Sequence, residues 1–435
     1  MMSISSFPCF WRGALLAAAI FSSAIAFGEN TEQTIFNPNF CTLTVTANGD
    51  LMAPPLMRLG TDDIIDISFD EISEDYRYLR YRLIHCNADW QPSRLLESEY
   101  LPRFNEGEIS DYAFSSNTFV HFVNYHLALP QEGMEPLVSG NYLLQVYDEN
   151  EPDETLLQVR FGVSDNRVAV GGHSSGRTDK GFNTEWQQLD VRLDPTGMTI
   201  QNPYQDLTVC VTQNQRPASR RSIRTPQRVQ GEEIIYEHNP DLIFPAGNEY
   251  RRFETVRISD PGMHVDSIRF GGTNYHVWLQ PDEWRAGRQY HYDSTQRGRF
   301  LVRESNSTDS DLGADYVTVH FSLEAPEVTD GDLYLEGMLS GHSLSERWKM
   351  KYDHNSGLYS LQVPLKQGSY NYQYVVAPRT PVATPDGIDR RKAVASPIEG
   401  DYYETVNEYL VEVYYHPPGA RADELVGYGV IVSRP

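Results

Sequence analysis

The sequence predicts an all-β protein built from tandem β-sandwich domains of the immunoglobulin or fibronectin kind. Short apolar runs with period-two alternation recur along the chain, and turn-forming Gly, Pro and Asn residues separate them. No stretch has the length and the apolar period of a long amphipathic helix. A chain of 435 residues is too long for one hydrophobic core, so we expect several such domains in series.

The chain opens with the features of a secretory signal peptide. Arg12 precedes an apolar run from Ala14 to Phe21, and Ala24-Ile25-Ala26 has the small-x-small pattern of a cleavage site. We therefore interpret residues 1–26 as a signal peptide. Cys9 lies before the apolar run, which argues against a lipid anchor. No later run reaches the roughly 18 apolar residues of a membrane helix, so we expect no membrane span.

Strand patterns dominate the chain from Asn30 to Phe161. Pro and Gly residues with turn chemistry stand between the predicted strands. Short strands at this spacing fit a sandwich, and we expect residues 27–165 to form the first domain. The predicted strands are 41–47, 64–69, 76–85, 119–129, 141–146 and 156–163.

A polar, glycine-rich stretch follows and predicts a mobile linker over residues 164–185. We expect residues 166–305 to form a second sandwich, either alone or as one unit with the first. A second linker, rich in Ser and Asp, is predicted at 306–313. The strands predicted for the second sandwich are 189–193, 207–211, 234–236, 253–258, 265–270 and 275–279.

Three alternating runs between glycine-containing turns predict a third sandwich over residues 306–435. In the last of these runs Tyr370, Tyr372 and Tyr374 share one face, which we expect to be buried. We also expect residues 310–435 to fold as an independent unit.

The order of motifs in this third domain resembles the glycogen-binding-like modules of the early-set immunoglobulin-like group. Such modules bind sugars on exposed aromatic platforms, because a pyranose ring stacks its C–H face on indole. Trp348 is the candidate platform, but Leu358 stands where a second Trp would be expected. We therefore favour a sandwich retained for its shape, with carbohydrate binding as the alternative.

The acidic composition limits the classes of partner. The chain has a formal net charge of −24 at pH 7. A field of that sign repels phosphate backbones and anionic lipid surfaces, so we exclude nucleic acid as a partner.

The cysteines that follow the signal peptide are Cys41, Cys86 and Cys210. An odd number permits one disulfide at most and leaves its pairing open. Each Cys lies in or beside an apolar strand-like run, which favours free buried thiols.

No motif of an enzyme or of a cofactor site stands out. Gly172-His-Ser174-Ser-Gly176 formally matches the Gly-x-Ser-x-Gly nucleophile elbow, but it lies in the predicted linker with no helix after it. Zinc motifs of the His-Glu-x-x-His and paired Cys-x-x-Cys kinds are absent, as are the glycine loops that bind nucleotides. We predict no catalytic residue, no metal and no cofactor.

One basic cluster interrupts the acidic background. No Asp or Glu occurs between Asn214 and Gln230, and Pro217 and Pro226 break the segment, which predicts an exposed loop. The guanidinium groups of such a loop could clamp carboxylates of a partner protein, and ordinary surface charge is the alternative. The candidate partner-binding residues are Arg216, Arg220, Arg221, Arg224 and Arg228.

Several sequence blocks resemble one known family over nearly the whole chain that follows the signal peptide. The blocks include Cys86-Asn-Ala-Asp-Trp-x-Pro-Ser93, Gly247-Asn-Glu-Tyr-Arg-x-Phe253, Leu365-Lys-Gln-Gly-x-Tyr-x-Tyr372 and Asp423-Glu-Leu-Val-Gly427. Together and in this order they resemble the type IX secretion system plug proteins of the Bacteroidota.

The resemblance implies a periplasmic, multi-domain β protein without catalytic residues. Plug proteins bind the periplasmic mouth of the outer-membrane β-barrel translocon and keep its pore sealed while no secretion substrate occupies it. The resemblance therefore implies a reversible seal as the function of this chain and the translocon as its partner. A periplasmic glycan-binding protein without catalytic activity is the alternative.

Overall fold

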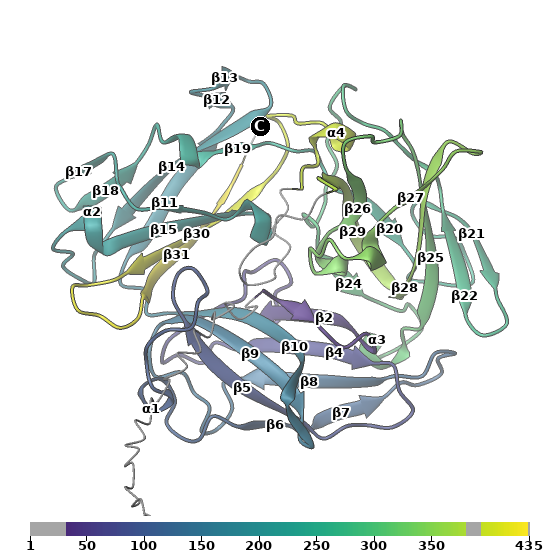
Figure 1. Ribbon diagram of the computed structural model, residues 1–435, viewed down its shortest axis with the longest axis horizontal. Helices are drawn as coiled ribbons and strands as arrows, with labels where there is room; N and C mark the ends of the chain where they lie inside the picture. Colours follow the sequence, from purple (N-terminus) through teal and green to yellow (C-terminus); the bar gives the residue numbers. More distant parts are fainter. Residues whose placement is uncertain (1–31, 380–392, 434–435) are drawn as a thin grey trace, which may run out of the picture.

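Three β-sandwiches lie side by side in the computed structural model, which describes residues 32–379 and 393–433 (Figure 1). The first sandwich lies below the other two in this view. The predicted all-β fold class is confirmed. The predicted signal peptide, residues 1–26, lies outside the described residues. The α-helices of the described part are single turns: α1 (Glu97–Tyr100), α2 (Pro203–Asp206), α3 (Ser310–Gly313) and α4 (Ser396–Glu399).

The first sandwich packs two sheets around one core. The first sheet contains β1 (Thr34–Ile35), β3 (Leu56–Arg58), β5 (Leu79–Cys86), β6 (Gly107–Ile109), β9 (Gly140–Asp148) and β10 (Glu151–Ser164). The second sheet has the order β2 (Phe40–Ala47), β4 (Ile65–Glu71), β8 (Val123–Leu129), β7 (Asp111–Phe114). Every second residue of β8 is buried, as its alternation predicts. Strand β7 ends its sheet.

The second sandwich combines two distant parts of the chain. Its first sheet contains β11 (Ala169–Ser175), β14 (Trp186–Asp194), β17 (Arg228–Gln230), β18 (Glu233–Tyr236) and β19 (Ile243–Pro245). A small hairpin of β12 (Arg177–Thr178) and β13 (Gly181–Phe182) follows β11. The second sheet has the order β16 (Arg221–Ile223), β15 (Leu207–Gln213), β30 (Glu408–Tyr415), β31 (Glu424–Val432).

The third sandwich contains the tyrosine-rich strand. One sheet is formed by β20 (Arg251–Glu254), β24 (Phe300–Val302), β26 (Asp332–Glu336) and β29 (Gly368–Ala377). The other is formed by β21 (Val265–Phe270), β22 (Tyr275–Leu279), β23 (Asp282–Glu283), β25 (Tyr316–Glu324), β27 (Lys351–Asp353) and β28 (Leu358–Lys366). Tyr370, Tyr372 and Tyr374 are all buried in its core, as predicted.

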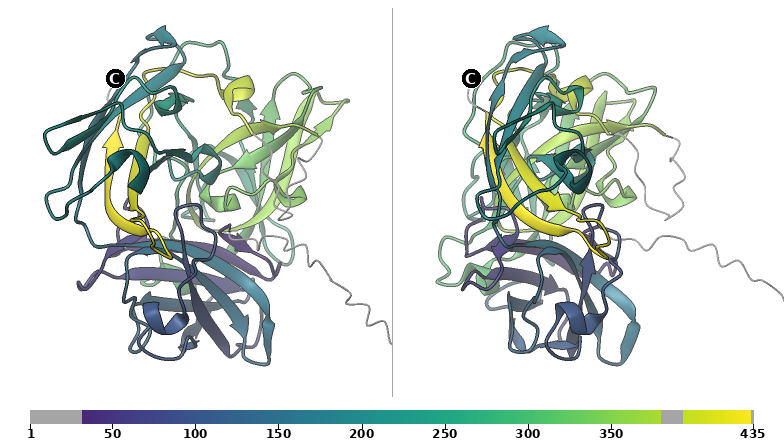
Figure 2. Two further views of the ribbon diagram at one scale, coloured as in Figure 1. Left: turned by 60° about the vertical axis from the view of Figure 1, so that its left-hand side comes forward. Right: turned by 90° about the vertical axis from the view of Figure 1, so that its left-hand side faces the viewer.

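The hydrophobic cores divide the chain at other places than the predicted boundaries. The third core includes Phe253 and Val277, which the prediction assigns to the second domain. The second core includes Val411 of β30, which the prediction assigns to the third domain. Figure 2 shows β30 and β31, in yellow, against the teal strands of the second sandwich. We therefore propose that the third domain, about 247–406, is inserted between β19 and β30 of the second.

The predicted linker at 164–185 is largely a β-strand. β11 pairs with β14 from Ala169 opposite Asp194 to Ser175 opposite Gln188. The Gly, Ser and His residues of this stretch carry little apolar alternation, so its strand conformation is set by the partner strand rather than by its own composition. The second predicted linker, 306–313, contains no strand and ends with α3.

Buried polar contacts join the three sandwiches. Lys366 Nζ of the third domain lies 2.6 Å from Asp70 Oδ2 of the first domain, and both side chains are 1% exposed. Arg299 pairs with Glu408 of the second domain and donates to the Met52 carbonyl of the first at 3.1 Å. Because a buried charge that loses its partner is costly, these contacts oppose separation of the domains.

The cysteines form no disulfide within the described residues. The Cys86 and Cys210 side chains are buried thiols outside any disulfide, as predicted, and the Cys41 thiol is half-buried. The joints between the domains therefore depend on hydrogen bonds and ion pairs and on apolar packing, such as that of Leu56 in the first domain with Leu425 in the second.

Candidate functional site

Two arginines of the predicted basic cluster point into the joints between domains. Arg216 Nε donates to Glu336 Oε1 of the third domain at 3.1 Å. Arg220 pairs with the buried Glu412 and donates to the Ala88 carbonyl of the first domain at 3.1 Å. These two guanidinium groups are occupied within the chain, contrary to the predicted exposed loop, because carboxylates distant in sequence fold against them.

The other three arginines of the cluster lie nearer the surface. Arg221 donates to two backbone carbonyls and lies over the Phe244 ring, 4.3 Å from its centroid. Arg228, on β17, forms an exposed pair with Glu237 at 2.9 Å. Arg224 is exposed and has no ion pair with the part of the chain that the structure describes. Only Arg224 and Arg228 remain candidates for contact with a partner.

The electrostatics of the Arg216–Glu336 pair indicate that it stabilises the fold. Burial raises the pKa of Glu336, but the charges of Arg216 and His342 outweigh burial and hold that pKa well below its usual range. Glu336 is therefore charged at neutral pH. Since its folded pKa is depressed, the stability that it contributes is present above the unfolded pKa and is lost as pH falls towards the folded value.

An exposed aromatic cluster lies on the first domain, where the second sheet ends. Tyr76 stacks on Tyr112 with ring centroids 4.5 Å apart, and Tyr78 meets Tyr76 edge-on at 5.2 Å. The Phe114 ring is edge-on to Tyr112, with centroids 6.4 Å apart. Tyr78 is 59% exposed and Phe114 49% exposed. We call these four residues the aromatic edge.

The position of β7 explains why these rings reach solvent. Tyr112 and Phe114 share the face of β7 that continues the core, and Tyr112 lies 6.1 Å from the buried Tyr125 ring. Among the residues that the structure describes, no strand follows β7 in its sheet, so the outer backbone groups of β7 face no partner strand there. Exposed aromatic clusters of this kind are typical of binding surfaces.

Acidic side chains lie beside the aromatic edge. Glu74 and Asp75 directly precede Tyr76 in the chain, and both are exposed. They give this side of the aromatic edge a negative charge. The surface therefore suits a partner segment that carries Lys or Arg, whose cations also bind the faces of tyrosine rings.

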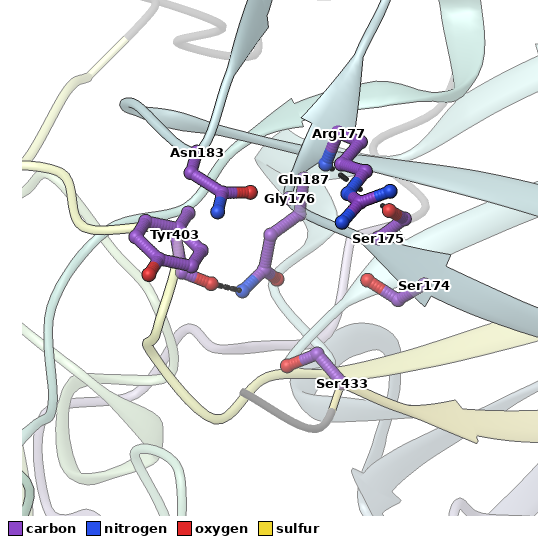
Figure 3. Close-up of a pocket in the computed structure, with 8 residues that line it drawn as sticks. All are labelled: Ser174, Ser175, Gly176, Arg177, Asn183, Gln187, Tyr403 and Ser433. Atoms are coloured by element: carbon purple, nitrogen blue, oxygen red, sulfur yellow. Dashed lines mark hydrogen bonds between the residues drawn. The ribbon is translucent and has the colours of Figure 1, made fainter.

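A polar pocket lies at the end of β11 in the second domain. Its volume is about 300 Å³, and Figure 3 shows side chains from β11, β12 and the segment before β30 around it. Ser174, Arg177 and Asn183 line it together with Gln187 and Tyr403. None of its lining residues is acidic.

The Gly-x-Ser-x-Gly match forms no nucleophile elbow. Ser174 and His173 are neighbours in β11, so their side chains point to opposite faces of the sheet. His173 lies outside, 3.5 Å from Asp190, and Ser174 lines the pocket. The required order of strand, sharp turn and helix is not present at this place.

The candidate sugar platform is also not exposed. Trp348 is 6% exposed and packs in the third core. Trp278 lies on the outer sheet, but His320 stacks on it at 4.5 Å and the Arg269 guanidinium lies 5.5 Å from its ring centroid. Both rings therefore lack the open face that a pyranose needs.

The fold and these surfaces define a class: a three-sandwich protein whose exposed features suit contact with another protein. A family model described as the type 9 secretion system plug protein 1st domain matches residues 41–165. The crystal structure of a hypothetical protein from Parabacteroides merdae is 38% identical, with a TM-score of 0.88, over 92% of this chain and 99% of that chain. The chain belongs to the type 9 secretion system plug protein family, as its sequence blocks predict, and its role is connected with that system.

Other comparisons add little. A DNA glycosylase, AlkC from Pseudomonas fluorescens, is 9% identical over 29% of this chain and 30% of that chain, with a TM-score of 0.16. The collagen adhesin of S. aureus is 8% identical over 93% of this chain and 95% of that chain, with a TM-score of 0.11. Both scores are too low to indicate a shared fold. No curated protein matches the chain. Within the described residues no helix has the length and apolar character needed to span a bilayer.

Proposed function

We propose that this protein is a periplasmic plug that reversibly seals the periplasmic mouth of the type 9 outer-membrane translocon while no substrate occupies it. The observation that carries the proposal is family membership. The family model covers the first sandwich from β2 to β10, and the solved relative spans all three sandwiches. A seal needs shape and a reversible interface and no reactive side chain.

The joints between the domains support a steric role. A plug must keep its shape when it contacts the pore. Domains that move relative to one another would leave gaps. The Lys366–Asp70 and Arg299–Glu408 pairs fix the third domain against the other two. Their burial makes separation of the domains costly.

We infer that the aromatic edge contributes to docking on the translocon. It lies in the domain that the family model matches, and it combines open aromatic rings, an unpaired strand edge and acidic neighbours. A stable specific interface buries on the order of 1,200–2,000 Å² in total. The aromatic edge would form the centre of such a surface and not all of it.

A strain that lacks the protein tests the sealing function. We expect large, normally excluded solutes to cross its outer membrane, while type 9 export continues at least in part. Entry of a large antibiotic and release of a secreted protein would be measured in parallel. Complementation with the native gene should restore the barrier. Unchanged permeability with the translocon present and free of substrate would contradict the proposal.

Binding to the isolated translocon tests the docking surface separately. The variant Tyr78→Ser with Phe114→Ser removes two exposed rings, each a candidate for a large share of the binding energy. We expect at least about tenfold weaker binding, equivalent to about 1.4 kcal/mol. Tyr204→Ser is the matched control, because Tyr204 is a 47% exposed ring on the second domain. If binding weakens equally in both variants, or in neither, the aromatic edge is not part of the interface. That outcome would not contradict the sealing function.

The same assay tests the remaining basic candidates. Arg224 and Arg228 are exposed, so charge reversal at both positions should weaken binding at low salt if they touch the translocon. Equal binding by the reversed and native proteins would exclude them.

A further inference from the structure

We propose that the outer edge of β7 binds an extended segment of the translocon as an added β-strand. The inference rests on the proposed docking surface and deepens it, because it states how the aromatic edge holds its partner and which kind of segment it binds. In strand addition, main-chain hydrogen bonds supply the affinity and alternate side chains supply the specificity.

The register of β7 with β8 determines which of its backbone groups face outwards. Ser115 N–H donates to the Phe122 carbonyl at 2.9 Å, directly beyond the β7–β8 ladder. Because hydrogen-bonded pairs alternate along an antiparallel ladder, Ala113 also turns its N–H and C=O towards β8. Tyr112 and Phe114 turn theirs away, and these groups have no hydrogen bond within the described residues. Backbone groups that are buried without a partner are rare, so these face solvent.

The opposite edge of the same sheet is protected, and β7 is not. β2 carries a bulge between Cys41 and Thr44, and Thr42 has a positive φ of 54°. The Thr42 hydroxyl also forms a hydrogen bond with the Tyr316 hydroxyl of the third domain. Bulges and covering elements are common protections of sheet edges. β7 has a regular register and contains no Pro and no Lys, so its edge is able to accept a further strand.

The two faces of β7 define the side chains that an added strand needs. Tyr112 and Phe114 belong to the aromatic edge, so residues of the added strand on this face would lie against aromatic rings. Asp111 lies on the other face, where its side chain is 76% exposed and pairs with His126 at 3.2 Å. A strand that alternates apolar or aromatic residues with Lys or Arg therefore matches both faces.

The charge around β7 decides which occupant fits. Glu74 and Asp75 are exposed beside the aromatic edge, and Asp111 is exposed on β7 itself. A second copy of this chain would bring the same carboxylates together, and like charges directly opposite each other destabilise a strand pair. A basic segment is attracted instead. The occupant is therefore a basic, extended segment of the translocon and not a second copy.

A peptide titration of the full-length native protein tests strand addition. The probe is acetyl-Lys-Val-Lys-Val-Lys-Tyr-amide, and isothermal titration calorimetry measures its binding. The control, acetyl-Lys-Lys-Lys-Val-Val-Tyr-amide, has the same composition without the alternation. We expect the control to bind at least about tenfold more weakly, because only alternation places the Lys and apolar residues on opposite faces of a strand. Equal binding of the two peptides, or no binding of the probe at millimolar concentration, would overturn the proposal.

Backbone methylation separates strand addition from contact through side chains. One version of the probe carries N-methyl groups on its Lys residues, and the other carries them on its Val and Tyr residues. An antiparallel strand turns the Val and Tyr amides towards β7, and a parallel strand turns the Lys amides towards it. We therefore expect one version to lose binding and the other to keep it. Equal effects of the two methylation patterns would contradict strand addition.

Hydrogen exchange and one variant locate the peptide on β7. The amide hydrogens of Tyr112 and Phe114 should exchange fast in the free protein and at least about tenfold more slowly with the probe bound. Asp111→Lys should weaken binding of the probe about tenfold, and Asp330→Lys, at an exposed Asp of the third domain, should leave it unchanged. Unaltered exchange at Tyr112 and Phe114 with the probe bound would place the peptide elsewhere and overturn the proposal.

The same exchange measurement on the complex with the isolated translocon connects strand addition to docking. We expect the Tyr112 and Phe114 amides to be protected there as well. Binding to the translocon without this protection would mean that the protein docks through side chains alone, which would overturn strand addition and leave the sealing function standing. The leak in the strain that lacks the protein is measured independently, so a failure of the sealing function is recognised separately.

Discussion

The ammonium group of Lys366 lies between the first and third domains. It donates to Asp70 and to the Asp311 carbonyl, each at 2.6 Å, and lies 4.1 Å from the centroid of the Phe122 ring. Burial raises the pKa of Asp70, and the Lys366 charge opposes that effect. The carboxylate and the ammonium therefore depend on each other.

Removing that ammonium tests the joint at the residue scale. Lys366→Met keeps the apolar stem but leaves Asp70 buried without its cation, so we expect the free energy of unfolding to fall by about 3–5 kcal/mol. Urea denaturation followed by fluorescence measures it. Lys349→Met is the control, because Lys349 is 30% exposed and pairs with Asp332 at 3.1 Å. That exposed pair should contribute less than about 1 kcal/mol. Similar losses in both variants would contradict this account.

Single residues also explain why the aromatic edge could not be predicted from the sequence. Tyr112 and Phe114 alternate as Tyr370 and Tyr372 do, yet the first two lie at an edge and the others in a core. Whether an aromatic face is covered depends on which strand packs beside it, and that partner is distant in sequence. Arg216 is a similar case, because nothing in the sequence around Arg216 indicates that it pairs with the distant Glu336.

At the scale of elements, alternation located many of the strands and failed at β11, which has no apolar pattern of its own. β8 and β22 are apolar at every second residue and were predictable for that reason. β11 is polar and Gly-rich, and pairing with β14 makes it a strand. The register of β30 with β15 joins Leu207 to Tyr415, a pairing that alternation within either strand does not encode.

Chain fragments test the division into elements. A fragment of residues 247–406 contains every strand of the third core, so we expect a cooperative thermal transition with β-type circular dichroism. The fragment 310–435, which the sequence predicts to be independent, lacks β20 to β24 and carries β30 and β31 without β15. We expect it to aggregate or to melt without cooperativity. A cooperative transition in 310–435 alone would contradict the insertion.

At the scale of the whole molecule, the joints should make the three sandwiches unfold together. Arg299 contacts the second domain through Glu408 and the first through Met52, while Lys366 adds the contact to Asp70. Differential scanning calorimetry of the native protein should give one transition. In Lys366→Met we expect the transition to broaden or split. Separate transitions in the native protein would mean that the joints are weak.

The insertion of the third domain has a consequence for biosynthesis. β15 leaves the ribosome long before β30, and until then Val209 and Val211 lack the strand that covers this side of the sheet. A chain that stops inside the third domain therefore leaves an open, apolar sheet edge in the second, which proteases and chaperones recognise. Because β30 and β31 close that sheet, an incomplete copy exposes this edge to proteases, and only a finished chain covers it.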